Sequence, residues 1–363
     1  MKDYKVLAMN LGSTSTKLAY YITDECQMKT NLAHTAEEIG SSKDIWDQYE
    51  MRKGAILKFM EENGIVLDEL DAVSTRGGHC EPIPGGTYRI NDKYRAQNKS
   101  GKYGIHPCNL GVEIANELAS MSDHAIAVTT DMPTTDELMP IARFTGLREI
   151  SRKASFQSLN HRAMASYYAE SIGKNYEDLN LVVVMLGGGI SVAAHERGRM
   201  VDGPDALTGD GPFSNNRCCT VPIGPLVDLC YSGKYTHAEM KRHINGEAGL
   251  KAYLGTTDVR EIQKKIEEGD TYARDVLEAM CYQTAKDIGA YATVLKGKVD
   301  AILFIGGMAN SEWITSHIKE RVEFIAPVVI LPGEREMESL CLNAYKAVSG
   351  QIELKEFDLK QEV

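Results

Sequence analysis

A short polar turn, Asn10-Leu11-Gly12-Ser13-Thr14-Ser15-Thr16-Lys17, separates two apolar runs near the start of the chain. Residues 6–9 lead into the turn and residues 18–22 lead out, which predicts a strand, a tight turn and a second strand. Backbone N–H groups, hydroxyls and an ammonium group can all donate to phosphate oxygens, so the turn suits an oxyanion. An ordinary hairpin turn with solvated hydroxyls is the alternative. The phosphate-binding candidates are Asn10, Gly12, Ser13, Thr14, Ser15 and Lys17.

A second stretch repeats this pattern. The apolar run 181–186 leads into Gly187-Gly188-Gly189, and another apolar run, 190–194, follows. Glycines let a polyphosphate approach the backbone without obstruction by Cβ atoms. The two hairpins therefore predict a duplicated domain with phosphate-facing turns. A P-loop is excluded, because no glycine precedes Lys17 and a strand follows where a helix is required.

Length and composition narrow the class of protein. A chain of 363 residues predicts two domains, which we expect at 1–150 and 151–336. The formal net charge of −11 and the lack of a basic stripe argue against nucleic acid as a partner. No signal segment or apolar run near the ~20 residues of a membrane span is present, so no membrane partner is expected. The eight cysteines lack a CxxC pair, which favours the cytoplasm.

Hydrophobic periodicity predicts an α/β chain with mixed sheets. Each half reads as three strands, a helix, a strand and a helix, with extra helices in the second half. Long irregular segments are expected at 82–105 and 202–224. The tail after residue 350 gives no clear pattern. The helices expected in the chain are 43–63, 108–121, 159–172, 225–232, 236–245, 258–268, 271–296, 311–320 and 336–349.

Two arginines are candidates for binding a transferring phosphoryl group. Arg76 follows the expected strand 71–75 and precedes two glycines, and Arg217 ends a loop rich in Gly, Pro and Asn. The planar guanidinium matches phosphate geometry. His106, just before Pro107, can donate to a carboxylate or phosphoryl oxygen. Each of these residues, taken singly, is equally consistent with an ordinary structural or surface position. Cys218 and Cys219 follow Arg217 and are either small apolar fillers or a metal or redox pair.

Acidic and glycine-rich positions complete the candidates. Asp131 ends an expected strand, where open α/β sheets place ligands; it can orient an arginine or a metal-bound water, or simply form a turn. Glu336 opens the last helix, where the helix dipole already favours an acid and Mg²⁺ binding is the second interpretation. The segment after the strand at 300–305 suits a nucleoside or a helix N-cap; its candidates are Gly306, Gly307, Asn310 and Ser311.

Taken in order, these motifs resemble the butyrate kinases of the acetokinase family, in the superfamily of actin, sugar kinases and Hsp70 ATPases. The resemblance covers nearly the whole chain. Besides the two hairpins it rests on Arg76-Gly77-Gly78, Pro82-Ile83-Pro84-Gly85-Gly86-Thr87, Gly211-Pro212-Phe213-Ser214 and Pro332-Gly333-Glu334-Arg335-Glu336. It implies duplicated actin-like ATPase domains of the ribonuclease H-like type, with the helix at 337–350 packed on the first domain.

The resemblance also implies an activity: reversible conversion of butanoate and ATP to butanoyl phosphate and ADP, with Mg²⁺. A branched or other short carboxylate is the alternative substrate, and a homodimer or larger assembly is expected. The implied roles place Asn10, Arg76, His106 and Arg217 around the phosphoryl group and carboxylate, Asp131 as an orienting acid, Asn10 and Glu336 beside the metal, and Gly187 to Gly189 and Gly306 to Ser311 along the nucleotide.

One catalytic position departs from the family pattern. Related kinases carry a histidine where this chain has Gln157. An amide still donates a hydrogen bond but is never cationic, and losing a transition-state donor typically costs ~10²–10³ in rate. A nucleotide-binding sensor that has lost phosphotransfer is therefore a second hypothesis. The retention of the other charged candidates favours the kinase.

Overall fold

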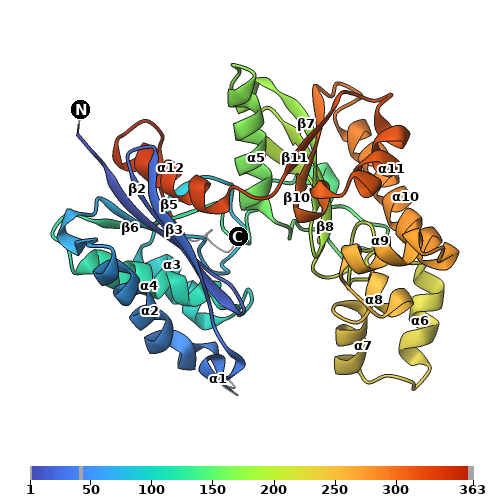
Figure 1. Cartoon of the computed structure of the whole chain (residues 1–363), viewed down its shortest axis with the longest axis horizontal. Coiled ribbons are helices and arrows are strands. Elements are labelled where there is room, and N and C mark those ends of the chain that lie inside the picture. Colours follow the sequence, from blue (N-terminus) through green and yellow to red (C-terminus); the bar gives the residue numbers. More distant parts are fainter. Residues whose placement is uncertain (1, 41–43, 359–363) are drawn as a thin grey trace. The chain divides into compact units, whose positions relative to one another are not determined.

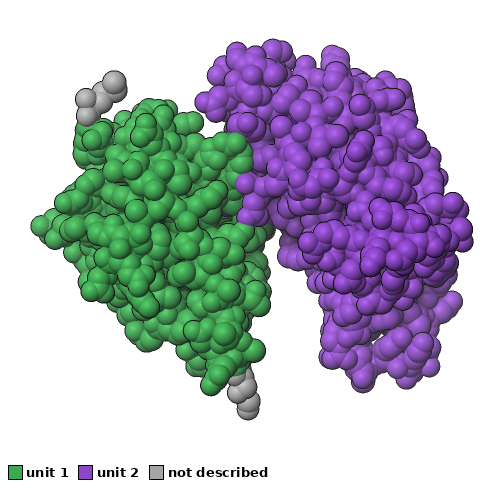
Figure 2. Space-filling view, viewed as in Figure 1, with its two compact units in different colours: residues 1–135, 335–363 green, residues 136–334 purple. Residues whose placement is uncertain are grey.

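The computed structural model describes residues 2–40 and 44–358. The chain divides into two compact units (Figure 2): unit 1 contains residues 1–135 and 335–363, and unit 2 contains residues 136–334. Each unit is built on one sheet. No helix in the described ranges combines the length and apolar character needed to cross a bilayer.

The division differs from the boundary expected at residue 150. Residues 136–150 group with unit 2 because backbone hydrogen bonds connect this segment to other residues of unit 2. The Met139 N–H donates to Val201 O at 2.9 Å, and the Arg152 N–H donates to Arg143 O at 2.9 Å. At the other end, the last helix, α12 (Glu336–Val348), belongs to unit 1.

Unit 1 contains a seven-stranded sheet of order β12-β5-β6-β4-β1-β2-β3. β1 pairs antiparallel with β2 and parallel with β4. Figure 1 shows α12 on one side of this sheet and α2, α3 and α4 on the other. The elements are β1 (Lys5–Leu11), β2 (Ser15–Ile22), β3 (Glu25–Ala33), α1 (Ala36–Ile39), α2 (Tyr49–Glu62), β4 (Ala72–Thr75), β5 (Thr87–Arg89), α3 (Asp92–Ser100), α4 (Cys108–Ser120), β6 (Ile126–Thr130) and β12 (Leu354–Glu356).

Helices on both faces explain why β1 reads as a continuous apolar run rather than an alternating one. Every residue from Val6 to Leu11 is buried. The Ser74 hydroxyl on β4 donates to Leu340 O of α12 at 2.9 Å, so the last helix is also hydrogen-bonded to the sheet.

Unit 2 contains a five-stranded sheet of order β11-β10-β7-β8-β9. Alternate β7 residues face opposite layers: Val182 and Val184 pack with α10 and α11, whereas Leu181 and Val183 pack with α5. The elements are α5 (Ser158–Ser171), β7 (Asn180–Leu186), β8 (Ile190–Glu196), β9 (Arg199–Asp202), α6 (Ile223–Tyr231), α7 (His237–Ile244), α8 (Gly249–Leu254), α9 (Val259–Glu267), α10 (Thr271–Val294), β10 (Ala301–Gly306), α11 (Glu312–Val322) and β11 (Val328–Pro332).

The two sheets share one topology. In unit 1 the order β3-β2-β1-β4-β6 joins an antiparallel meander to two parallel strands, and in unit 2 β9-β8-β7-β10-β11 does the same. The predicted duplicated α/β fold with mixed, helix-flanked sheets is therefore confirmed.

The prediction of an irregular segment at 82–105 is wrong in part. β5 and α3 lie within it. The polar composition of α3 hides it from a search for apolar periodicity, although Asn91 caps its N-terminus and Tyr94 is fully buried. The tail also contributes, because β12 pairs parallel with β5 and Phe357 is buried.

Candidate functional site

The first hairpin brings together two candidates from opposite ends of the chain. Asn10 lies near the end of β1, and its Nδ2 donates to Glu336 Oε2 of α12 at 2.7 Å. Both side chains are buried. Lys17 lies opposite Asn10 in the β1–β2 register. The fold thus places the two residues expected beside a metal in direct contact within unit 1.

A buried arginine that the sequence interpretation missed organises the turn of this hairpin. Arg52 of α2 is fully buried and donates to the carbonyl oxygens of Gly12, Ser13 and Ser15 at 2.9, 3.3 and 3.2 Å. It also donates to Thr16 Oγ1 at 3.1 Å. These bonds occupy the carbonyl side of the turn, whereas the Ser13 and Thr14 side chains remain exposed. The available signal was a cation on the apolar stripe of the expected helix 43–63.

Arg76 and His106 share an electropositive region of unit 1. Arg76 follows β4, and its N–H donates to Met9 O at 3.3 Å. Burial, and then the positive charge of Arg76, lowers the pKa of His106 to about 4. His106 Nδ1 accepts the Cys108 N–H at 3.2 Å. At neutral pH His106 is therefore a neutral imidazole whose Nε2–H is the donor.

Asp131 anchors a neighbouring loop. Its Oδ1 accepts the Gly86 N–H at 2.9 Å, and its own N–H donates to Gly86 O at 3.1 Å. The residue is 2% exposed and has a φ of 44°, a conformation that aspartate tolerates better than most residues. The observed contacts give Asp131 a structural role in holding the Pro82–Thr87 segment.

In unit 2 the second hairpin lies against the Arg217 loop. The glycine turn is closed by the Gly187 N–H, which donates to Gly189 O at 3.2 Å. A Cβ atom on Gly189 would lie 2.5 Å from Arg217 Nη1, so the guanidinium packs on bare backbone. Arg217 Nη1 also donates to Ala206 O at 3.2 Å, and Ser214 Oγ donates to Gly188 O at 3.2 Å. Burial lowers the pKa of Arg217, but a guanidinium remains charged at neutral pH.

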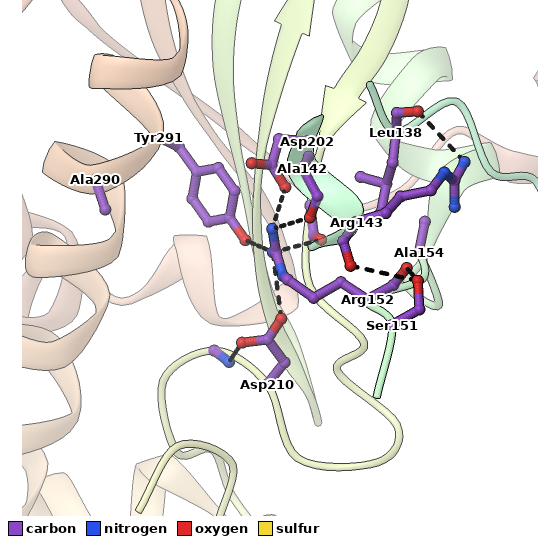
Figure 3. Close-up of polar contacts among 12 residues, drawn as sticks. Leu138, Ala142, Arg143, Ser151, Arg152, Ala154, Asp202, Asp210, Ala290 and Tyr291 are labelled. Carbon is purple, nitrogen blue, oxygen red and sulfur yellow. Dashed lines mark hydrogen bonds and ion pairs between the residues drawn. The ribbon is translucent and has the colours of Figure 1, made fainter. Parts of the chain in front are cut away.

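A second missed arginine fixes the base of this loop (Figure 3). Arg152 donates to Asp202 Oδ1 at 2.9 Å, to Gly203 O at 3.2 Å and to Asp210 Oδ2 at 3.3 Å. The same guanidinium also donates from Nη2 to the Tyr291 hydroxyl of α10 at 3.4 Å. Arg152 therefore ties both ends of segment 203–210 to the sheet and to α10.

Gln157 immediately precedes α5, and its Oε1 accepts a hydrogen bond from the Ser191 hydroxyl of β8 at 3.0 Å.

The segment after β10 forms a tight turn followed by a helix cap. Gly306 has a φ of 89° and exchanges two backbone hydrogen bonds with Gly333, at 2.9 and 3.0 Å. Asn310 Nδ2 donates to Gly307 O, and the Ser311 hydroxyl caps α11. The capping interpretation of Ser311 therefore holds in this structure.

The residues present suit a magnesium ion and a nucleotide. Glu336 is 8% exposed, has an amide as its neighbour, and forms no ion pair with a basic side chain in the described part of the chain. Mg²⁺ usually takes only one or two protein carboxylates and completes its shell with water and phosphate oxygens. Among the described residues no group of three or more His, Cys, Asp or Glu side chains forms a metal cage, which is compatible with that mode. A Cβ atom on Gly188 or Gly307 would meet nothing within 4 Å, so both backbones are open to a ligand.

Comparison with known proteins identifies relatives along nearly the whole chain. The family model of the acetokinase family matches residues 88–329. A probable butyrate kinase of Bacteroides thetaiotaomicron is 46% identical over 348 residues, covering 96% of this chain and 98% of that protein. Butyrate kinase 2 of Clostridium acetobutylicum is 43% identical over 354 residues, covering 98% and 99%.

Solved structures support the fold. The acetate kinase of Porphyromonas gingivalis superimposes with a TM-score of 0.76 at 20% identity, covering 93% of this chain and 98% of that one. A propionate kinase from Francisella tularensis gives a TM-score of 0.73 at 18% identity, covering 94% and 98%.

Proposed function

Because the chain belongs to the acetokinase family, we propose that it transfers the γ-phosphoryl group of ATP reversibly to a short-chain carboxylate, with butanoate as the first candidate. The structural observation that carries the proposal is the buried Asn10–Glu336 pair at the first hairpin. A buried carboxylate without a basic partner favours a cation, and the substrate ATP is used as its magnesium complex.

The proposed chemistry needs positioning and charge neutralisation rather than a general base. A carboxylate substrate is already ionised at pH 7, so it can attack phosphorus directly. Arg76 and neutral His106 of unit 1, and Arg217 and Gln157 of unit 2, supply donors for anionic oxygens. Asn10 and Glu336 would hold Mg²⁺, which when bound neutralises charge on the ATP phosphates. The glycines at 187–189 and 306–307 would face the nucleotide, with Asn310 and Ser311 beside them.

An assay with hydroxylamine as the trap tests the proposal. Purified protein with ATP and Mg²⁺ receives acetate, propionate, butanoate, isobutanoate or valerate in separate reactions, and acyl phosphate is measured as hydroxamate. We expect the highest kcat/KM with butanoate. Isobutanoate as the preferred acid would instead make the protein a branched-chain kinase. Measurable ATP binding without hydroxamate from any acid would contradict the kinase and favour the sensor.

Two coarser properties belong to the same proposal. We propose a homodimer or larger assembly, supported by α6, in which apolar Ile223, Val227 and Tyr231 are exposed. Light scattering across a concentration series tests this assembly, and a monomer at every concentration would contradict it.

We also propose a cytoplasmic location, supported by eight free cysteines. Fractionation of the source cells, with the protein followed by antibody, tests the location.

A further inference from the structure

A continuous line of hydrogen bonds in unit 2 ends at Gln157. The Tyr176 hydroxyl lies 2.7 Å from His195 Nδ1, and His195 Nε2 lies 3.4 Å from His161 Nδ1. His161 Nε2 lies 2.9 Å from the Ser191 hydroxyl, which lies 3.0 Å from Gln157 Oε1. We call Tyr176, His195, His161 and Ser191 the relay. It joins a turn before β7, one face of β8 and α5 to Gln157, the catalytic position where the chain departs from its family pattern.

Both relay histidines are uncharged. His161 and His195 have no exposed surface, and burial lowers the pKa of His161 to about 3 and the pKa of His195 well below its usual range. A neutral imidazole has one N–H donor and one acceptor nitrogen. Each histidine can therefore give one hydrogen bond and take one, which matches its two relay neighbours.

The relay has a preferred direction. A phenol is a good donor and a weak acceptor, whereas an imidazole nitrogen is a good acceptor, so Tyr176 donates to His195 Nδ1. His195 then carries its proton on Nε2 and donates to His161 Nδ1. His161 likewise donates from Nε2 to the Ser191 oxygen, and the single hydroxyl proton of Ser191 goes to Gln157 Oε1. The reversed direction would leave the phenol oxygen as the acceptor and would turn the Gln157 amide around.

We propose that the relay is a positioning device that fixes the amide orientation of Gln157. With Oε1 occupied by Ser191, the Nε2 group has no partner among the described residues and its two N–H donors remain available to an anionic oxygen. This inference rests on the proposed phosphoryl transfer. It assigns Gln157 as a neutral donor held in one orientation, in place of a histidine.

A spectroscopic experiment tests the relay without any assay of activity. Protein labelled with ¹⁵N only at histidine is examined by two-bond ¹H–¹⁵N correlation at pH 7, and His161→Gln and His195→Gln variants assign the two signals. We expect both residues as neutral Nε2–H tautomers. An Nδ1–H tautomer or a cation at either position overturns the proposal, whether or not the protein is a kinase.

A double-mutant cycle tests the link from the relay to Gln157. Ser191→Ala should lower kcat about tenfold or more with KM for ATP little changed, up to the ~10²–10³ expected for a lost donor. In a Gln157→Ala background the same change should alter kcat less than about twofold. Tyr176→Phe, at the far end, should show the same dependence on Gln157 with a smaller effect.

Controls separate positioning from general damage. Thr284→Val removes another fully buried hydroxyl, one that donates to Met280 O at 2.9 Å in α10, and should leave kcat unchanged. Equal losses for Ser191→Ala with and without Gln157 overturn the proposal. A wild-type protein with no kinase activity would refute the proposed function, while the tautomers would still decide the relay.

Discussion

The two sheets begin with the same hairpin, but an arginine supports each turn in a different way. At the β1–β2 turn, Arg52 is fully buried and donates hydrogen bonds to the carbonyl oxygens of Gly12, Ser13 and Ser15. At the β7–β8 turn, Arg217 lies on the backbone of Gly189 and donates to Ala206 O. The first arginine is part of the fold, whereas the second lies against the glycine turn that we propose to face the nucleotide.

The difference shows how residue type follows from the position of the cation. A buried guanidinium satisfies carbonyl groups, so the first turn can carry side chains and present hydroxyls outward. At the second turn the guanidinium occupies the space that a Cβ atom on residue 189 would need, so this position requires glycine. The β1–β2 and β7–β8 turns therefore depend on their arginines in different ways. Substitutions at the first turn should change stability, and substitutions at the second should change activity.

The largest effect is expected from Arg217→Ala. Loss of a cation that neutralises the transferring group should lower kcat by about 10³-fold, or about 4 kcal/mol, with little change in the urea midpoint. Steady-state hydroxamate assays and urea unfolding measure the two quantities. Arg217→Lys is the control for charge without the planar fork. Turnover near that of the wild type in Arg217→Ala would remove Arg217 from the site.

Arg52→Met should act on stability instead. The substitution leaves several turn carbonyls without donors, and we expect the free energy of unfolding to fall by about 3 kcal/mol. Urea unfolding followed by circular dichroism measures the change. Lys58→Met, on an exposed position of the same helix, serves as the matched control. An unchanged midpoint for Arg52→Met would show that the first turn does not depend on this cation.

Gly189→Ala tests the close approach of Arg217. The new methyl group would lie 2.5 Å from Nη1 and must displace the guanidinium, so we expect kcat to fall about tenfold, or about 1.4 kcal/mol. Gly188→Ala adds the same methyl group where nothing lies within 4 Å and controls for the altered turn. Equal activities of the two variants would argue against the stacked arrangement.

A gradual, pH-dependent effect on stability is expected from the histidines beside the two hairpins. His161 bonds Ser191 in unit 2, and His34 bonds Thr16 at 2.8 Å in unit 1. Burial lowers both pKa values, that of His161 to about 3. The unfolded chain binds these protons from about pH 6.5 downward, so stability present above pH 6.5 is lost in acid, by at most about 1.4 kcal/mol per pH unit per histidine.

Urea midpoints between pH 7 and 5 measure this loss. His161→Gln should flatten the profile more than His34→Gln, because His161 is fully buried and His34 is not. Parallel profiles for wild type and His161→Gln would mean that folding does not shift the pKa of His161, which would contradict the expected effect of burial.

Local patterns predicted the fold because each hairpin combines continuous apolar runs with a distinctive turn. The same reasoning missed Arg52 and Arg152. Arg52 lies on the apolar stripe of its helix, but the burial of either arginine depends on carbonyl and carboxylate groups that are distant in the sequence. It missed α3 because that helix is polar. The relay was invisible for another reason: Tyr176, His195 and Ser191 meet only once β8 pairs with β7. The contact between Asn10 and Glu336 followed from resemblance and not from spacing.

The return of α12 to unit 1 has a consequence for biosynthesis. A ribosome releases residues 136–334 as one uninterrupted segment, whereas the sheet of unit 1 lacks one covering layer and the strand β12 until residues 336–356 emerge. We expect unit 2 to become protease-resistant on nascent chains while unit 1 is still vulnerable, as limited proteolysis of stalled chains of increasing length would reveal. The nascent protein thus completes unit 2 before unit 1. Loss of α12 would leave β1 and β2 without a covering helix on one face of the sheet.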